Sequence, residues 1–569
     1  MEKRLVAAFA LSVLILLGWS VISRKWFPPP PQAPDVTAGA PAVAPAPTDT
    51  PPELTAPPVP AIAAPEVVDA SAVVAPAEHE IRLETDFAQI VLTNKGGRVL
   101  SWKLKQFESD GRAVDFVSSS ARRDDLLPLA LVFEDRAILP GINAALFAAS
   151  RTEDASGRTH VDFRWSDGAG SEVLKSFVFR PGEPLIDLEI KAVDRGRAVT
   201  ARVSWGPGFE VEDPDHRSNT YYYGQALVYD GAVVTRYTKG DIDETIAIPE
   251  TARLQWAGME DQYFAALFLP AGSRGAVTIA PYSQSPLAIP GKNVPEDLAS
   301  SGMIAVSIPE GKTQLFVGPK NFGELSALGH GLEKAVWFSS YQAIYVCAKP
   351  IFLALRYVHD HWVSNWGVAI ILLTVGLRIV LFPLNQYSMV KMRRVAGDMA
   401  RVQPKLKAIQ AKYKKNKEPE SRQKMNEETM ALYKREGVNP FGGVSGCLPL
   451  LIQMPILWAF FDVLTATVEL RGAPFFGWIR DLTHPDPFWI APILMGATMF
   501  VQQKMTPTAN IDPQQQRMML FMPVIFTVMF GSLPSGLVLY YFVNNLLGIG
   551  QQWLVNHQIA RQEAAPSKA

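Results

Sequence analysis

A long apolar run that holds a single charge is the feature that most restricts the fold of this chain. The run extends from Val363 to Leu384, and the stretch "LLTVGLRIVLFPL" within it contains Arg378. An apolar run of this length is typical of a helix that crosses a bilayer. A cation near the centre of such a helix costs at least about 2.5–3.5 kcal/mol. We therefore predict a transmembrane helix over 361–385 in which Arg378 needs polar surroundings or access to the bilayer surface.

Further apolar runs predict a multi-pass membrane protein. A cleaved signal peptide is the alternative for the first run, but that run is long and no A-x-A-like site follows it, so we predict a retained anchor over 1–27. The segment 335–360 is apolar but interrupted by polar residues and Pro350, which favours an amphipathic helix in the interface over a seventh span. The expected spans after 361–385 are 447–467, 488–504, 518–533 and 535–553.

The part of the chain before these helices divides into two segments. Residues 28–78 are rich in Pro and Ala, which predicts an extended, disordered tether. Residues 79–330 alternate apolar and polar side chains between Gly, Pro and Asp turns, for example at Asn94–Gly97. This pattern, sustained over such a length, predicts a large all-β sandwich.

The segment between the second and third predicted spans is strongly basic. Residues 386–446 hold 14 Lys and Arg against 6 Asp and Glu, a net charge of +8 (14 − 6). The positive-inside rule places such a loop in the cytoplasm. With six spans, both termini, including the tail 554–569, are then cytoplasmic, whereas the β domain and the loop 468–487 lie outside.

This basic segment also has helical periodicity. Leu406, Ile409 and Tyr413 share one helix face, a second helix follows, and "NKEPE" at 416–420 is the expected turn, so we predict a helical hairpin over 386–440. Its charges are either contacts for partners or a solvated face that also signals topology. The candidate contacts are Lys405, Lys407, Lys412, Lys414, Lys415 and Lys417.

Several predicted spans carry polar side chains at membrane depth. Buried polar groups in lipid must face each other or water, so their coincidence predicts a polar cavity between helices, with Arg378 as its strong charge. The alternatives are snorkelling of Arg378 to the interface, hydrogen bonding between helices by Gln453, and simple packing of the tyrosines. Asp462 lies in the outer half of its span and is not paired with Arg378. The candidate groove residues are Thr374, Arg378, Gln453, Tyr540, Tyr541, Asn544 and Asn545.

No catalytic, cofactor or metal motif accompanies these features. The chain has two cysteines, Cys347 and Cys447, and neither belongs to a CxxC or Cys/His cluster. The sequence "HDH" at 359–361 is more typical of a solvated helix end than of a metal site. No G-x-x-x-x-G-K-S/T motif is present, so we expect no nucleotide-driven step and no enzyme activity.

The membrane part of the chain closely resembles the YidC membrane protein insertase family. The resemblance covers about 335–555, and the anchor, tether and β domain match the Gram-negative form of the family in arrangement. It rests on "NWGVAIILLTVGLRIVLFPLNQYSMVKM", "VQPKLKAIQAKY", "TMALYKREGVNPFGG", "CLPLLIQMPI", "ELRGAPFFGWIRDL", "DPFWIAPILMGATMFVQQKM" and "FMPVIFTVMFGSLPSGLVLYYFVNN".

The resemblance implies a fold and a mechanism. The fold is a polytopic α-helical membrane protein of six transmembrane helices, five of which form the insertase core, with a periplasmic β-super-sandwich of the sugar-mutarotase type. The core has a hydrophilic groove that is open to the cytoplasm and to lipid, with Arg378 at the position of the family's groove arginine. The incoming segment uses a hydrophobic slide along the helices that hold Thr374 and Tyr540/Tyr541.

The resemblance also implies location and partners. The protein is expected in the bacterial inner membrane, where it inserts and helps fold nascent membrane proteins, alone or with the Sec translocon. The hairpin is implicated in receiving substrates and targeting factors, such as the ribosome and the signal recognition particle pathway. No sequence-specific nucleic-acid binding is expected. The chain departs from the family at Asp462, and in the long spacer between Asn439-Pro440 and Cys447.

Three other functions compete with insertion. A secondary transporter predicts inverted repeats and broken helices, which the apolar runs do not show. A periplasmic enzyme would need chemistry in the β domain, whose histidines are scattered, and a fold does not by itself carry a function. A passive scaffold of the Sec machinery would use the hairpin only to gather partners.

Overall fold

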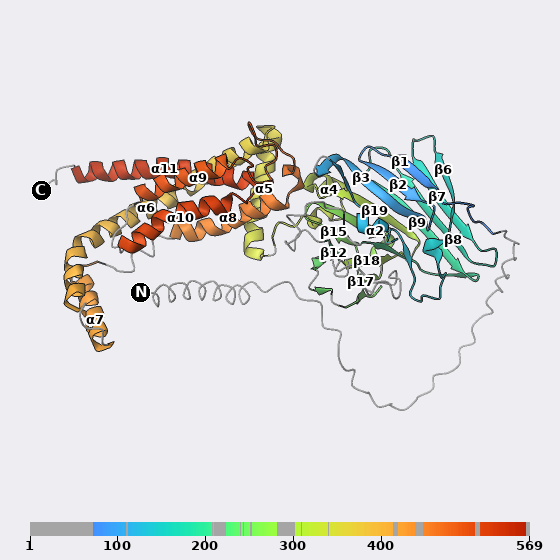
Figure 1. Cartoon of the computed structure of the whole chain (residues 1–569), viewed down its shortest axis with the longest axis horizontal. Helices are drawn as coiled ribbons and strands as arrows, with labels where there is room; N and C mark the ends of the chain where they lie inside the picture. Colours follow the sequence, from blue (N-terminus) through green and yellow to red (C-terminus); the bar gives the residue numbers. More distant parts are fainter. Residues whose placement is uncertain are drawn as a thin grey trace, which may run out of the picture.

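The computed structural model describes residues 72–564 apart from 110–111, 124, 207–208, 210–223, 239–240, 243, 251–252, 282–301, 309, 340, 414–418, 439–447 and 507–512. The predicted anchor and nearly all of the predicted tether lie outside the described residues. The described residues form a β domain followed by a helix bundle (Figure 1).

Three sheets build the β domain within the described residues. The order of the first is β1 (Glu80–Glu84), β2 (Ala88–Thr93), β3 (Arg98–Ser109), β4 (Arg112–Asp115). The largest runs β13 (Val234–Tyr237), β12 (Gln225–Tyr229), β15 (Trp256–Glu260), β16 (Phe264–Pro270), β19 (Lys312–Pro319), β9 (Leu185–Asp194), β8 (Glu172–Phe179), β7 (Thr159–Ser166), β6 (Ala148–Glu153), with β10 (Arg197–Ala198) on β9. The third runs β14 (Ile246–Ile248), β17 (Val277–Pro281), β18 (Gly302–Ser307), β11 (Arg202–Trp205), β5 (Leu131–Val132).

The alternation that predicted strands is visible in their burial. Along β8 every second side chain is buried, so one face of the strand lies in the core and the other is partly exposed. The predicted turn at Asn94–Gly97 is confirmed, because β2 ends at Thr93, β3 begins at Arg98, and these two residues pair. Gly96 and Gly97 have φ of 71° and 57°, a backbone conformation that residues with a Cβ rarely adopt.

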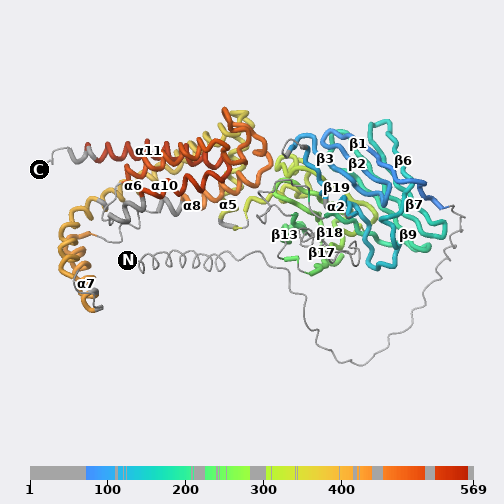
Figure 2. Tube along the Cα trace, viewed as in Figure 1, coloured from blue at the N-terminus to red at the C-terminus, as the bar shows by residue number. Residues whose placement is uncertain are grey.

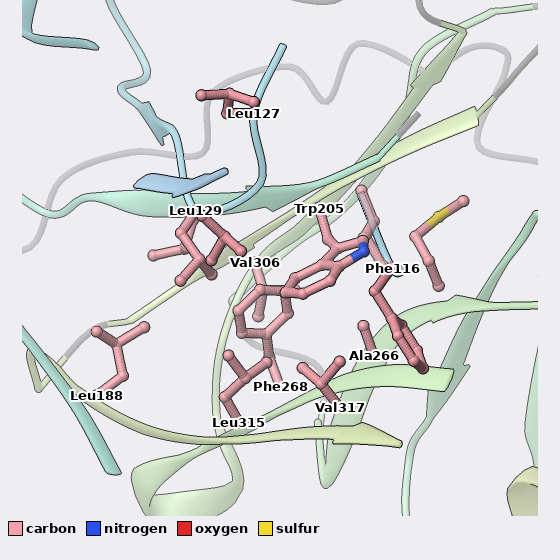
Figure 3. Packing of buried hydrophobic residues seen from close by; sticks show 14 of the residues in the cluster. Phe116, Leu127, Leu129, Leu188, Trp205, Ala266, Phe268, Val306, Leu315 and Val317 are labelled. Carbon is pink, nitrogen blue, oxygen red and sulfur yellow. The ribbon is translucent and has the colours of Figure 1, made fainter. Parts of the chain in front are cut away.

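The core of the β domain lies between the largest sheet and the third sheet. Trp205 of β11 packs edge-on against Phe268 of β16 with ring centroids 6.4 Å apart (Figure 3). Val306 of β18 and Leu315 of β19 join the same buried cluster. Side chains from two facing sheets therefore interdigitate, as in a sandwich.

The helices follow the β domain in chain order. They are α4 (Phe322–Leu328), α5 (Gln342–His361), α6 (Trp366–Tyr413), α7 (Pro419–Arg435), α8 (Leu448–Ala466), α9 (Ile490–Met505), α10 (Pro513–Phe530) and α11 (Ser535–Ala564). A short helix, α2 (Ser119–Arg123), and the 3-10 turns η1 (Ile142–Ala144), η5 (Ala271–Ser273), η7 (Leu332–Ala335) and η9 (Val468–Leu470) lie in connections.

Several helix boundaries differ from the predicted segments: for example, α10 begins at Pro513 rather than at 518, and α6 begins at Trp366 rather than at 361. The helix expected over 335–360 begins only at Gln342, since Ala335 belongs to the 3-10 turn η7 and the backbone is extended at Val336 and Tyr341. Helix α6 does not end near residue 385 but continues through Pro383 and Pro404 to Tyr413, so one helix joins the predicted span to the hairpin. Helix α11 extends through most of the predicted tail.

The number of membrane-spanning helices is not established by these helices alone. Within the described part of the chain, α6 is the one helix that is long and apolar enough to cross a membrane. Shorter apolar helical stretches cover Gln453–Ala466 and Leu520–Phe530. The prediction of six spans therefore stays a prediction.

The β domain and the bundle share a continuous contact. Gln262 donates to the carbonyl of Thr465 at the end of α8, and Glu469 of η9 accepts from the Phe322 amide of α4. The Arg471 guanidinium lies 5.1 Å from the ring centroid of Tyr263. The hairpin helix α7 and the C-terminal part of α11 lie at the opposite end of the bundle (Figure 2).

Candidate functional site

Arg378 lies where α6 packs against α11. Its Nη2 donates a 2.8 Å hydrogen bond to the backbone carbonyl of Asn544. Its Nε is buried, and no described residue accepts a hydrogen bond from it. The head group is therefore held against the neighbouring helix with part of its hydrogen-bonding capacity unused, which is uncommon for a buried donor.

The predicted residues of α8 and α11 meet beside this contact. Gln453 Nε2 donates to the Tyr540 hydroxyl at 3.0 Å. The Tyr540 ring stacks on Phe460 at a centroid distance of 4.3 Å. Tyr541 turns toward α10 instead, where it meets Phe530 edge-on at 4.6 Å. The two adjacent tyrosines thus face different helices.

Thr374 and Asn545 are buried, whereas Arg378 and Asn544 are partly exposed. The Thr374 hydroxyl donates to the Ile370 carbonyl of its own helix at 2.7 Å. This bond satisfies the Thr374 proton locally, as serine and threonine often do in membrane helices. Of the predicted groove residues, the structure therefore brings Arg378 and Asn544 together, and Gln453 and Tyr540 together.

Two residues that the sequence interpretation missed also belong to this region. A Cβ added at Gly548 of α11 would lie 3.0 Å from Arg378 Nη2 and against Gln502 Nε2 of α9. The absence of a side chain at Gly548 therefore lets both polar groups approach α11. Gly548 follows Asn544 by four residues and so shares its helix face, a spacing that could have pointed to it.

A polar seam between α6 and α11 continues toward the hairpin end. Gln551 Nε2 donates to the Phe382 carbonyl at 3.3 Å, and Gln386 Nε2 donates to Gln558 Oε1 at 3.0 Å. Asn385 is buried, and its Nδ2 has no acceptor among the described residues. Together with Arg378 Nε, this is a second unsatisfied donor on α6.

The hairpin pairs some of its predicted contact residues internally. Lys405 lies 2.8 Å from Glu436, and Lys412 lies 2.6 Å from Glu428, which also accepts from the Tyr413 hydroxyl. The hydrogen bond between them raises the pKa of Lys412 and lowers the pKa of Glu428. Lys407 is exposed. The remaining predicted contacts, Lys414, Lys415 and Lys417, lie outside the described residues.

The remaining polar candidates lie elsewhere. Asp462 hydrogen-bonds Ser339, in the segment that leads into α5, rather than Arg378. His359 stacks on Trp366 at 3.8 Å and contacts Asp360. Among the described residues no group of three His, Cys, Asp or Glu side chains could hold a metal ion.

Comparison with known proteins covers both halves of the chain. A family model described as "YidC periplasmic domain" matches residues 80–354, and one described as "60Kd inner membrane protein" matches residues 358–563. The membrane protein insertases YidC of Syntrophus aciditrophicus and Geobacter metallireducens are each 33% identical to this chain. The alignments cover 98% and 99% of this chain and 100% of each relative.

A solved structure of an active YidC insertase is 18% identical, with a TM-score of 0.35, over 85% of this chain and 94% of its own. The family assignment does not depend on it, because the relatives match nearly end to end above 30% identity. The β domain is accordingly periplasmic and the helices form an inner-membrane insertase core. The chain belongs to the YidC family of membrane protein insertases, which are not enzymes.

Proposed function

We propose that the polar region around Arg378 is the groove that receives the hydrophilic tail of an inserting membrane protein. Support comes from the two donors on α6, Arg378 Nε and Asn385 Nδ2, that no described residue satisfies. Buried donors usually have partners, and a polar polypeptide or water could supply them. A guanidinium in a low-dielectric setting also attracts acidic groups more strongly than it would in water.

The groove draws on four helices. Arg378 is on α6, Gln453 on α8, Gln502 on α9, and Tyr540 and Asn544 on α11. A polar site that reaches partway across the bilayer shortens the apolar distance that a tail must cross. Moving a polar group through the remaining hydrocarbon then costs less, because unsatisfied polar groups are expensive there.

The apolar segment of the substrate would slide along the same helices. Thr374 and Tyr540 themselves are buried, so they would support the slide rather than contact the segment. Ile379 and Val380, next to Arg378, are exposed to the surroundings of the bundle and are better placed for such contact. Transfer of the apolar segment into lipid would supply about 25 cal/mol per Å² of apolar surface buried.

The membrane potential would add to this driving force. A charge that crosses a potential of 100 mV gains about 2.3 kcal/mol, and an outside-positive potential favours outward movement of acidic tails. Arg378 would attract the same tails, so both effects favour the same substrates. We infer that the groove opens toward the hairpin end, since the hairpin lies at the end of the bundle opposite the periplasmic domain. We further propose that both termini are cytoplasmic, as the positive-inside rule predicts for six spans.

The hairpin would receive substrates and targeting factors. Lys405, Lys407 and Lys412 are all exposed, but Lys405 and Lys412 are paired with acidic residues of the hairpin, whereas no described acidic residue pairs with Lys407. A partner would therefore meet Lys407 more readily than the paired lysines. We propose the Sec translocon, the ribosome and the signal recognition particle pathway as partners, on the family resemblance.

The groove is tested by insertion of a single-span protein with an acidic tail into liposomes that hold only this purified chain. Arg378→Ala is expected to lower insertion about tenfold. This change corresponds to the loss of one charge-assisted hydrogen bond between the guanidinium and the acidic tail, which contributes about 1.5 kcal/mol. Protection of the tail from external protease measures insertion. Arg561→Ala is the matched control, because Arg561 is an exposed arginine on α11 that lies outside both the groove and the hairpin.

The outcomes separate the candidate functions. Equal insertion by wild type and Arg378→Ala would keep an autonomous insertase but remove the groove charge from its mechanism. A loss that is the same for acidic and uncharged tails would make Arg378 a structural residue. No insertion above bare liposomes, by protein shown to be folded, would favour a scaffold that acts only with the Sec translocon.

A further inference from the structure

The loop between α8 and α9 exposes a group of aromatic side chains on the same side of the bundle as the periplasmic domain. Phe476 is 66% exposed and Phe488 is 64% exposed, and Trp478 and Trp489 are also exposed. We call these four residues the aromatic rim. Large exposed aromatic side chains that gather in one short loop indicate a surface that meets another apolar partner.

The aromatic rim is held in place by a buried carboxylate. Asp486 Oδ1 accepts from Trp478 Nε1 at 2.9 Å and from the Phe488 amide at 3.0 Å, and its Oδ2 accepts from the Ala491 amide at 2.7 Å. Asp486 therefore fixes the tryptophan, the turn before α9 and the first turn of α9 at once. The Trp489 ring occupies the space above Gly531, where a Cβ would collide with it.

Further hydrogen bonds join the loop to the ends of two other helices. The Asn365 side chain, just before α6, donates to the Pro474 carbonyl at 3.0 Å. At the start of α11, the Ser535 amide donates to the His484 carbonyl at 2.8 Å, and the Gly536 amide donates to the Leu482 carbonyl at 2.9 Å. The loop is thus a built platform on the outer ends of α6, α9 and α11.

We propose that the aromatic rim is buried in the outer leaflet of the bilayer, at the boundary between headgroups and acyl chains. The rim continues the lipid-facing surface of the bundle, because α9 begins at Ile490, directly after Trp489, and exposes Ile493 and Leu494. Trp489 also reaches Gly531, beside the exposed Val528 of α10. Tryptophan is enriched at this depth in membrane proteins.

The lengths of the neighbouring helices support the same partner. The 16 residues of α9 extend about 24 Å at 1.5 Å per residue, less than the ~30 Å of a bilayer core. At 13 residues, the apolar stretch 518–530 of α10 is shorter still. Aromatic side chains at the outer ends of these helices would complete the apolar band. Arg480 and His484, exposed in the same loop, would then lie among the headgroups.

Site-directed spin labelling of the full chain tests the proposal. Cys347 and Cys447 are the chain's two cysteines, so their replacement by serine leaves a background for single labels. Nitroxides at Phe476→Cys and Phe488→Cys would be compared in vesicles of phosphatidylethanolamine and phosphatidylglycerol. Arg480→Cys is the control within the loop, and Val524→Cys on the exposed face of α10 is the reference for the acyl region.

For each nitroxide we would measure the ratio of its accessibility to oxygen over its accessibility to a water-soluble nickel complex. We expect this ratio at positions 476 and 488 to be higher than at position 480 and closer to the value at position 524. Equal nickel accessibility at 476, 488 and 480 would overturn the proposal and leave the rim as a surface for another protein. Both substituted side chains are exposed, so folding should persist. Labelling of unmodified protein by a photoactivatable lipid is a second measurement, and absence of label from residues 473–489 would contradict the proposal.

Discussion

The β domain buries whole charged side chains, the helix bundle buries the Nε of the partly exposed Arg378, and the two regions satisfy these groups to different degrees. In the β domain, Glu260 lies between Arg236 at 2.6 Å and Lys320 at 2.9 Å, and its side chain is 3% exposed. Lys175 donates to three backbone carbonyls, those of Gly96, Gly97 and Leu129. In the bundle, by contrast, Arg378 makes one hydrogen bond to the described residues, and its Nε has no acceptor among them.

This difference separates charges that only stabilise the fold from charges that can still bind a substrate. A buried charge that is fully paired stabilises one arrangement and has no capacity left for a ligand. A buried donor without a partner is a source of instability in a purely structural setting, and it suits a site that something else completes. The comparison therefore predicts that substitutions in the β domain lower stability, whereas substitutions near Arg378 lower insertion.

The largest effect is expected at Glu260. Glu260→Gln replaces a carboxylate that pairs with two cations by an amide with one acceptor oxygen, so Arg236 or Lys320 faces an NH₂ group. Breaking a buried pair in this way costs about 3–5 kcal/mol. Hydrogen exchange of the β12 and β15 amides in the full chain, in detergent, would measure the loss of local stability.

The matched control for Glu260 is Glu172→Gln. Glu172 is the exposed first residue of β8, so the same chemical change there should leave exchange nearly unaffected. If Glu260→Gln were as stable as wild type, the buried group of Glu260, Arg236 and Lys320 would contribute no more to stability than Arg378 does. The contrast between the two regions would then fail.

The difference between wild type and Glu260→Gln should also depend on pH. Burial alone would raise the pKa of Glu260, but Arg236 and Lys320 outweigh it and hold the pKa below the ordinary value of 4.5. The native state therefore binds this proton less readily than the unfolded chain. The contribution of Glu260 is complete above pH 4.5 and is lost as the pH falls through its lower folded pKa.

The same exchange measurement, repeated from pH 7 to below pH 4.5, checks this dependence. Protonated Glu260 resembles glutamine, so the gap in stability between the two proteins should narrow on acidification. Burial raises the pKa of the neighbouring Asp261, so Asp261 changes the stability with pH in the opposite direction. Its effect does not alter the gap, because Asp261 is present in both proteins. A gap that stays constant with pH would indicate that the loss in Glu260→Gln arises from packing rather than from charge.

An intermediate effect, on insertion, is expected at Gly548. Gly548→Ala places a methyl group where Arg378 Nη2 and Gln502 Nε2 now lie, so both side chains must move away from α11. Overpacking of this kind costs about 1–3 kcal/mol, and the flexible ends of both side chains favour the lower end. We expect severalfold slower insertion of acidic-tailed substrates in liposomes.

Gly550→Ala is the control for Gly548→Ala, because a Cβ at Gly550 would meet no atom of the described residues within 4 Å apart from its own stretch of α11. Both substitutions raise the helix propensity of α11 equally. Equal insertion by the two variants would show that the position of Arg378 relative to α11 does not matter. If Gly548→Ala lowered stability but not insertion, the contact of Arg378 and Gln502 with α11 would be structural, like the buried charges of the β domain.

The sequence predicts the elements better than it predicts which polar groups meet. Alternation in β8 and the Asn94–Gly97 turn are local signals, and the structure confirms both. The hairpin face is a local signal too, since Leu406 and Ile409 pack against a small buried cluster of its two arms. Lys175 shares the inward face of β8 with Val173 and Phe177, so the pattern already contained a sign of a buried charge.

The missing information concerns contacts between distant segments. The approach of Gln502 to Arg378 depends on how α9 and α11 pack, which no periodicity specifies. Which hairpin lysines are paired depends on the register of α6 against α7. Thr374 lies four residues before Arg378 and so shares its helix face, but its hydroxyl bonds to its own backbone. Spacing places a side chain on a face and does not determine its partner.

The smallest effect is expected at Tyr540. Tyr540→Phe removes the hydroxyl that accepts from Gln453 but keeps the ring that stacks on Phe460. Hydrogen bonds between membrane helices contribute about 0.6 kcal/mol on average, so the thermal midpoint in detergent should fall slightly and insertion should persist. Tyr541→Phe is the control, because its ring contacts Phe530 rather than Gln453. Strong loss of insertion at an unchanged midpoint would instead make the Tyr540 hydroxyl a substrate contact, and the hydrogen bond between α8 and α11 would then belong to the incompletely satisfied site rather than to the structural contacts.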